Sequence, residues 1–225
     1  MLDVGGDSTR PGSVCVNDEE EWSRIEPILK RFCHRIPISV DTHKTEIARR
    51  AIEMGAVMIN DITGAADPSL IEVVANSKAL LAFMFNSFSS AHCFSNTKTA
   101  LTKDLAVEVI AAWANSHSQS LTSQGISFER QVMDTGLGAF LSPDAEVSFR
   151  IIEEYWRIRC PSKGRMLGCS RKGFLKQSGE RAPHDRDRLS ADIAKQVAKE
   201  TPADTSIYIR VHNVTLHRRL IRDCD

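Results

Sequence analysis

Several apolar runs of this sequence end on a polar or ionisable residue, and those residues could bind a ligand together. They are Asp41, Asn60, Asp134, the basic segment Ser170–Lys172, and the pair Arg210 and His212. Carboxylates accept paired N–H groups from an amidine edge, while an amide and a lysine can address the remaining heteroatoms of a ring. We therefore expect Asp41, Asn60, Asp134 and Lys172 to suit a flat heterocycle rich in donors and acceptors.

A second group of residues predicts an anion site. Arg210 and His212 alternate within a late apolar run, so in a strand both side chains would point to one face. Ser170, Arg171 and Lys172 would add donors from the neighbouring strand. Because the arginine fork matches phosphate oxygens, the sequence predicts a phosphate site there, separate from the heterocycle site.

Taken singly, some of these residues have a purely structural explanation. Asp41 could cap the helix that follows it, Asn60 and Asp61 could form a turn, and Arg171 could lie in a solvated loop. A structural explanation is harder for Asp134, because Gly136 and Gly138 follow it and would allow close backbone approach to a flat ligand.

The periodicity predicts about seven strand–helix units that would position these residues. Predicted strands cover residues 1–5, 38–41, 57–62, 79–85, 130–134, 165–169 and 206–212. Predicted helices cover 18–34, 43–53, 68–76 with Asp67 as its cap, a long helix ending near 123, 143–159, 185–200 and a short terminal helix. Continuous apolar strands alternating with helices are typical of a parallel sheet.

The expected fold class is therefore α/β, a TIM (β/α)8-type barrel with about seven of its eight units. In such a barrel the carboxyl ends of the strands share one face, which holds the active site. A closed barrel needs eight strands, so we expect the missing unit at the N-terminus. No shift in composition or linker divides the chain, and we expect one domain over residues 1–225.

The composition excludes several classes of protein. Lys and Arg number 29, as do Asp and Glu, so no overall charge draws the chain to nucleic acid or to a membrane surface. No apolar stretch approaches the ~20 residues of a spanning helix. Six cysteines without a C-x-x-C pair predict reduced, mostly buried thiols in a cytoplasmic protein. The remaining histidines, His117 and His217 among them, are expected at the surface or as caps.

These motifs resemble those of the dihydropteroate synthases, the folate-pathway members of the pterin-binding barrel family. The resemblance runs essentially from end to end and keeps the family's order. Its strongest pieces are Gly5–Gly12, Ser39–Thr42, Ile59–Ile62, Ser170–Phe174 and Arg210–Val214.

The resemblance implies an enzyme that condenses 7,8-dihydropterin-6-ylmethyl pyrophosphate with p-aminobenzoate to give 7,8-dihydropteroate and pyrophosphate. By family position, the pterin would be held by Asp41, Asn60, Asp134, Lys172 and Met84, p-aminobenzoate by Thr9, Arg10, Pro11 and Ser170, and pyrophosphate by Arg210 and His212. Lys172, Arg210, His212 and Arg10 would be the catalytic set. The resemblance also implies Mg²⁺ as cofactor, inhibition by sulfonamides and a cytoplasmic homodimer.

The sequence departs from the family pattern at the start. The family's first strand and loop, which supply an Asn associated with Mg²⁺, have no counterpart here, so no metal ligand is identified. Phe85, Thr135, Ala139 and Asn213 replace the family's usual His, Pro, Phe and Asp. Two alternatives stay open: an inactive barrel fragment or part of a fused folate-pathway protein, and a folate-dependent methyltransferase, which would need neither the 8–12 segment nor the 210–212 segment.

Overall fold

The structure is a computed structural model that describes residues 1–8, 14–87, 101–176 and 182–222. Its seven strands form one sheet in chain order, and every neighbouring pair is parallel. They are β1 (Leu2–Val4), β2 (Ile38–Asp41), β3 (Met58–Asp61), β4 (Leu80–Met84), β5 (Gln131–Asp134), β6 (Gly164–Leu167) and β7 (Ser206–Ile209). The predicted seven-stranded α/β barrel architecture is confirmed.

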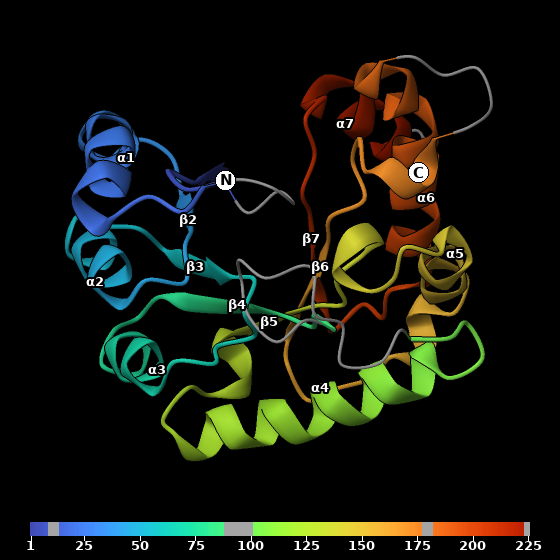
Figure 1. Ribbon diagram of the computed structural model, residues 1–225, viewed down its shortest axis with the longest axis horizontal. Coiled ribbons are helices and arrows are strands. Elements are labelled where there is room, and N and C mark those ends of the chain that lie inside the picture. The colour runs from blue at the N-terminus through green and yellow to red at the C-terminus, as the bar shows by residue number, and fades with distance from the viewer. Residues whose placement is uncertain (9–13, 88–100, 177–181, 223–225) are drawn as a thin grey trace.

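The helices lie outside the curved sheet (Figure 1). They are α1 (Asp18–Phe32), α2 (Thr45–Glu53), α3 (Pro68–Ala75), α4 (Ala106–Ser123), α5 (Ala145–Glu153), α6 (Asp187–Glu200) and α7 (Val214–Arg222). No helix among the described residues is long and apolar enough to cross a membrane.

Both faces of the sheet carry buried apolar side chains, which explains why the strands read as continuous apolar runs. On the inner face, Met58, Ala82, Val132 and Met166 form a small cluster. The alternate residues of the same strands pack in the larger cluster between sheet and helices, as Phe83 does. Side chains two apart along a strand share a face, so the inner cluster identifies the residues that point into the barrel.

Side-chain caps begin three of the helices. Asn17, Asp67 and Asp144 accept hydrogen bonds from the backbone N–H groups of Glu20, Ser69 and Glu146, respectively. The prediction that Asp67 caps the third helix is therefore confirmed.

Two predicted elements extend well past their observed C-terminal ends. The last strand was predicted to include Arg210 and His212, but β7 ends at Ile209, because its neighbour β6 ends at Leu167 and the Arg210 N–H donates to the Leu167 carbonyl at 2.9 Å. Helix α5 ends at Glu153, well before the predicted residue 159. The chain turns there because Tyr155 is buried and donates from its hydroxyl to the Met166 carbonyl at 3.0 Å.

The expectation of mostly buried thiols is wrong for the part of the chain that the structure describes. Of its four free cysteines, only Cys169, next to strand β6, is buried. Cys15 is exposed, while Cys33 and Cys160 are half-buried. The latter three lie in loops or at a helix end, where neighbouring side chains cover less of the chain.

Candidate active site

The strand register brings four of the predicted residues to the inner side of the sheet. Asp41 ends β2 and is paired with Asn60 of β3, while Met84 ends β4 and is paired with Asp134 of β5. Each lies two residues beyond an inward-facing position of its strand, so all four face the barrel interior near the carboxyl ends of the strands. Asn60, Met84 and Asp134 are buried, and a quarter of the Asp41 side chain is exposed.

Arg210 crosses the barrel mouth from the last strand to the first two. Its Nη1 lies 3.2 Å from Asp41 Oδ2 and 3.4 Å from Asp3 Oδ2. Burial disfavours the guanidinium charge, but the carboxylates of Asp41, Asp134 and Asp3 outweigh it and raise the pKa of Arg210. Arg210 therefore stays charged and attached to the carboxylates.

The pKa of Asp41, the partner of Arg210, is also shifted. Burial, helped by repulsion from Asp3 and Asp61, outweighs the opposing charge of Arg210 and raises the pKa of this carboxyl to about 7. Asp3 was not among the residues predicted from the sequence. The only signal was its place in the Leu2–Val4 strand, two residues before the glycine-rich segment.

Lys172 lies in the loop after β6 and approaches the same region. Its Nζ donates to the Leu137 carbonyl at 2.9 Å and lies 5.0 Å from the centroid of the Phe140 ring. Burial lowers the pKa of Lys172 to about 8, with Asp134 opposing this shift and Arg210 adding to it. Lys172 therefore interacts electrostatically with both Asp134 and Arg210.

Asp134 is held by the glycine-rich segment that follows it. The N–H of Gly136 donates to Asp134 Oδ1 at 2.9 Å, and Asp134 is 2% exposed. Gly136 has φ +64°, and a Cβ there would collide with the carbonyl oxygen of Phe85. The close approach that requires a glycine at position 136 is thus to the Phe85 backbone. From the sequence, a close approach to a ligand had been predicted there.

Ser170 and His212 form a second pair. The His212 backbone N–H donates to Ser170 Oγ at 3.2 Å, and the same oxygen lies 3.1 Å from His212 Nδ1. The imidazole is therefore oriented by Ser170. Because β7 ends before them, Arg210 and His212 do not alternate along the strand as predicted, and the contacts described here give them different partners.

One other predicted residue lies away from this site, and three fall outside the described residues. Arg171, predicted as a phosphate donor, has φ +59°. It donates from Nε and Nη2 to the two carboxylate oxygens of Asp187, each at 2.8 Å. Its role at this loop is structural, since it ties the segment to the start of α6. Thr9, Arg10 and Pro11 lie outside the described residues.

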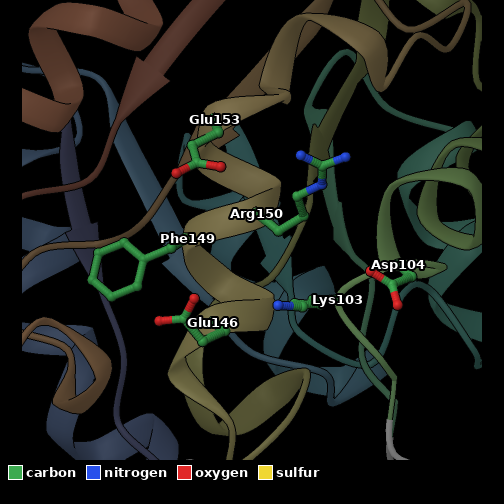
Figure 2. Close-up of a pocket in the computed structure, with 6 residues that line it drawn as sticks. All are labelled: Lys103, Asp104, Glu146, Phe149, Arg150 and Glu153. Carbon is green, nitrogen blue, oxygen red and sulfur yellow. The ribbon is translucent and has the colours of Figure 1, made fainter.

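A surface hollow of about 300 Å³ is formed by residues unrelated to the predicted site. Figure 2 shows its lining: Lys103, Asp104, Glu146, Phe149, Arg150 and Glu153. The last four belong to α5, and the hollow carries both signs of charge. None of the residues at the barrel mouth contributes to it, so it is not the candidate site.

The described residues contain no cluster of three or more His, Cys, Asp or Glu side chains that could hold a metal ion. Mg²⁺ usually needs only one or two protein carboxylates together with substrate phosphates and water. Asp41, which lies at the barrel mouth beside Arg210, fits that smaller requirement.

The comparisons with known proteins agree with this architecture. The family model described as "Pterin binding enzyme" matches residues 1–212. The dihydropteroate synthase of Bacillus subtilis (strain 168) is 29% identical over 230 residues, which cover 100% of this chain and 74% of that protein.

Solved structures of two dihydropteroate synthases superpose closely on the fold. The Burkholderia cenocepacia enzyme complexed with 7,8-dihydropteroate has a TM-score of 0.85 at 26% identity, covering 99% of this chain and 79% of that one. The Xanthomonas albilineans enzyme with 4-aminobenzoic acid has a TM-score of 0.84 at 26% identity, covering 99% and 77%. With the family match extending over nearly its whole length, the chain belongs to the pterin-binding enzyme family.

Proposed function

We propose that this protein is a dihydropteroate synthase, which joins p-aminobenzoate to 7,8-dihydropterin-6-ylmethyl pyrophosphate. The observation that carries the proposal is the placement of Asp41, Asn60 and Asp134 on the inner face of the sheet, with Arg210 across its mouth. A carboxylate and amide pocket beside a fixed guanidinium suits a flat ring that bears a phosphate group. The named substrates and products of the similar enzymes support the same chemistry.

In this proposal the pterin ring lies at the carboxyl ends of β2 to β5. Asp134 accepts the 2-amino and N3–H donors of the pterin, since each carboxylate oxygen has two lone pairs and only Oδ1 is used by Gly136. Asn60 and Lys172 address the ring's other heteroatoms. Met84, which is buried and faces inward beside Asp134, lines the apolar side of the pocket.

The reaction forms a bond between the arylamine nitrogen and the pterin methylene carbon, breaks the bond from that carbon to pyrophosphate, and releases one amine proton. The arylamine is a weak nucleophile because its lone pair is delocalised into the ring. A dihydropterin can stabilise positive charge at its methylene, so departure of pyrophosphate comes first. Arg210, His212 and Lys172 then stabilise the leaving charge, a major source of catalysis.

His212 can donate to that anion from Nε2. Ser170 Oγ lies at hydrogen-bond distance from Nδ1, so a hydroxyl donating there leaves the proton of a neutral imidazole on Nε2. Mg²⁺, when bound with the substrate near Asp41, would neutralise part of the pyrophosphate charge. Arg10, Thr9 and Pro11 retain their proposed place at the p-aminobenzoate site by family position.

The purified chain incubated with both substrates and Mg²⁺ tests the proposal. We expect 7,8-dihydropteroate and pyrophosphate in equal amounts, with product formation reduced when a sulfonamide competes with p-aminobenzoate. Calorimetry with a pterin that lacks phosphates is run in parallel. Binding without turnover would leave a pterin-binding protein and overturn the synthase activity; absence of both would overturn the pterin site itself.

A further inference from the structure

Asp3 contacts both Asn60 of the proposed pterin pocket and Arg210 of the proposed pyrophosphate site. Its Oδ2 lies 3.4 Å from Asn60 Nδ2 and 3.4 Å from Arg210 Nη1. Asp3 faces inward on β1, opposite Ser39, and a quarter of its side chain is exposed. Both contacts are long for N–H···O bonds, so the negative charge of the carboxylate supplies much of the attraction.

The contact with Asn60 decides which way that carboxamide points. An ionised carboxylate can only accept hydrogen bonds, so it requires the Nδ2 side of Asn60 to face Asp3. The Oδ1 atom of Asn60 then points away from Asp3. A buried amide held in this way presents a defined acceptor to a ligand, and its oxygen and nitrogen cannot exchange places without facing a carboxylate with an acceptor.

The contact with Arg210 fixes the other side of the mouth. Strands β1 and β7 lie at opposite edges of the seven-stranded sheet, so Arg210 has to reach across from one edge to the other. Asp3 and Asp41 meet it there with one oxygen each. The guanidinium packs against Gly168, where a Cβ would lie 3.4 Å from Nε and Nη2, an ordinary contact distance.

We propose that Asp3 is a positioning residue for this site: it sets the orientation of the Asn60 carboxamide and holds the Arg210 guanidinium across the barrel mouth. The inference rests on the proposed function for the identity of the ligand, but its geometric content concerns only Asp3, Asn60 and Arg210. Asp3 acts through these neighbours and does not itself contact the reacting atoms.

The test is a double-mutant cycle on pterin affinity. Asp3→Ala should weaken the binding of a phosphate-free pterin by about tenfold, the typical result of leaving a buried polar group misdirected. Asp3→Asn, whose amide oxygen can still accept from Asn60, should bind within about threefold of wild type. In an Asn60→Ala background the Asp3→Ala substitution should cause no further loss, because the carboxamide it orients is gone.

Ser39→Ala is the matched control. Ser39 is the register partner of Asp3, and its buried hydroxyl has no hydrogen-bond partner among the described residues, so its removal should leave pterin affinity unchanged. Additive losses from Asp3→Ala and Asn60→Ala would overturn the proposal. If the wild-type protein binds no pterin, the proposed function fails. The same double-mutant cycle is then measured as free energies of unfolding, which test the Asp3–Asn60 coupling without a ligand. Non-additive values would support the coupling, and additive values would overturn it.

Discussion

The guanidinium of Arg210 lies 3.2 Å from the carboxylate of Asp41, although 169 residues separate them in the chain. Arg210 follows the last strand and Asp41 ends the second, so this contact joins distant parts of the sheet. It also places Arg210, which is proposed to bind pyrophosphate, beside the proposed pterin pocket. An arriving anion therefore meets a cation already held by Asp41 and Asp3.

Arg210→Ala should lower kcat by roughly 10²-fold, because it removes a preorganised charge that stabilises the leaving group. The affinity for a phosphate-free pterin should stay close to that of wild type. Steady-state kinetics and calorimetry measure the two quantities. Arg210→Lys, which keeps the charge but loses the fork, should be intermediate. Loss of phosphate-free pterin binding in Arg210→Ala would make the arginine a structural residue of the pocket.

Asp134→Asn should weaken pterin binding by at least tenfold. The substitution keeps the shape of the side chain but places an N–H₂ group opposite the donors of the pterin, at a cost of roughly 1–3 kcal/mol. Calorimetry with a phosphate-free pterin measures the change. Asp192→Asn is the control, since Asp192 is an exposed residue of α6 paired with Arg188. Equal affinities for the Asp134 variant and wild type would remove Asp134 from the pocket.

The rate should depend on pH through two groups of the site. Burial raises the pKa of Asp41 to about 7, and burial lowers the pKa of Lys172 to about 8. If the active form needs an ionised Asp41 and a protonated Lys172, kcat/KM rises through about pH 7 and falls above about pH 8. Lys172→Arg should abolish the alkaline limb alone. An unchanged alkaline limb in that variant would assign it to another group.

The sequence predicted the parts of this fold that depend on local pattern. Strand β2 and the N-terminus of α1 lie where predicted, because apolar runs buried on both faces and capping residues are visible in the sequence. Strand β7 and helix α5 were predicted too long, because their ends are set by the length of β6 and by the buried Tyr155, which are tertiary effects.

The same division holds for the candidate site. Asp41, Asn60 and Asp134 could be predicted, because polar residues that end apolar strands converge in a parallel barrel. Asp3 was missed, since a carboxylate inside a three-residue strand has no distinguishing spacing. His217 was expected at the surface but is 2% exposed, with its Nε2 3.2 Å from Ser190 Oγ between α6 and α7. Such helix-to-helix partners cannot be predicted from a single sequence.

Asp41→Asn should stabilise the fold at neutral and alkaline pH. The Asp41 pKa rises from 3.8 to about 7 on folding, so between these values the native state binds more protons and its stability falls as pH increases. Removing the charge should gain about 1–2 kcal/mol at pH 8, after allowing for the exposed part of the side chain, and little at pH 4. Urea denaturation at both pH values measures this; a loss of stability at pH 8 would mean that the Arg210 ion pair outweighs the burial cost.

The last prediction concerns a buried charge cluster behind the site. Lys44 Nζ lies 2.8 Å from Glu21 Oε2 and 3.2 Å from Asp7 Oδ2, and these three side chains are 13%, 0% and 5% exposed, respectively. Burial lowers the pKa of Lys44, but hydrogen bonds to Glu21 and Asp7 outweigh it and the net shift is upward. The cluster ties the loop before α1 to the start of α2.

Lys44→Met should cost about 3–5 kcal/mol, because it leaves two carboxylates buried without their cation. Adding Glu21→Gln should recover part of this loss. Lys30→Met is the control: Lys30 is 63% exposed in its pair with Glu26, and such pairs contribute about 0–1 kcal/mol. Urea denaturation compares the variants, and a Lys44→Met protein within 1 kcal/mol of wild type at pH 8 would show that water or local rearrangement compensates the two carboxylates.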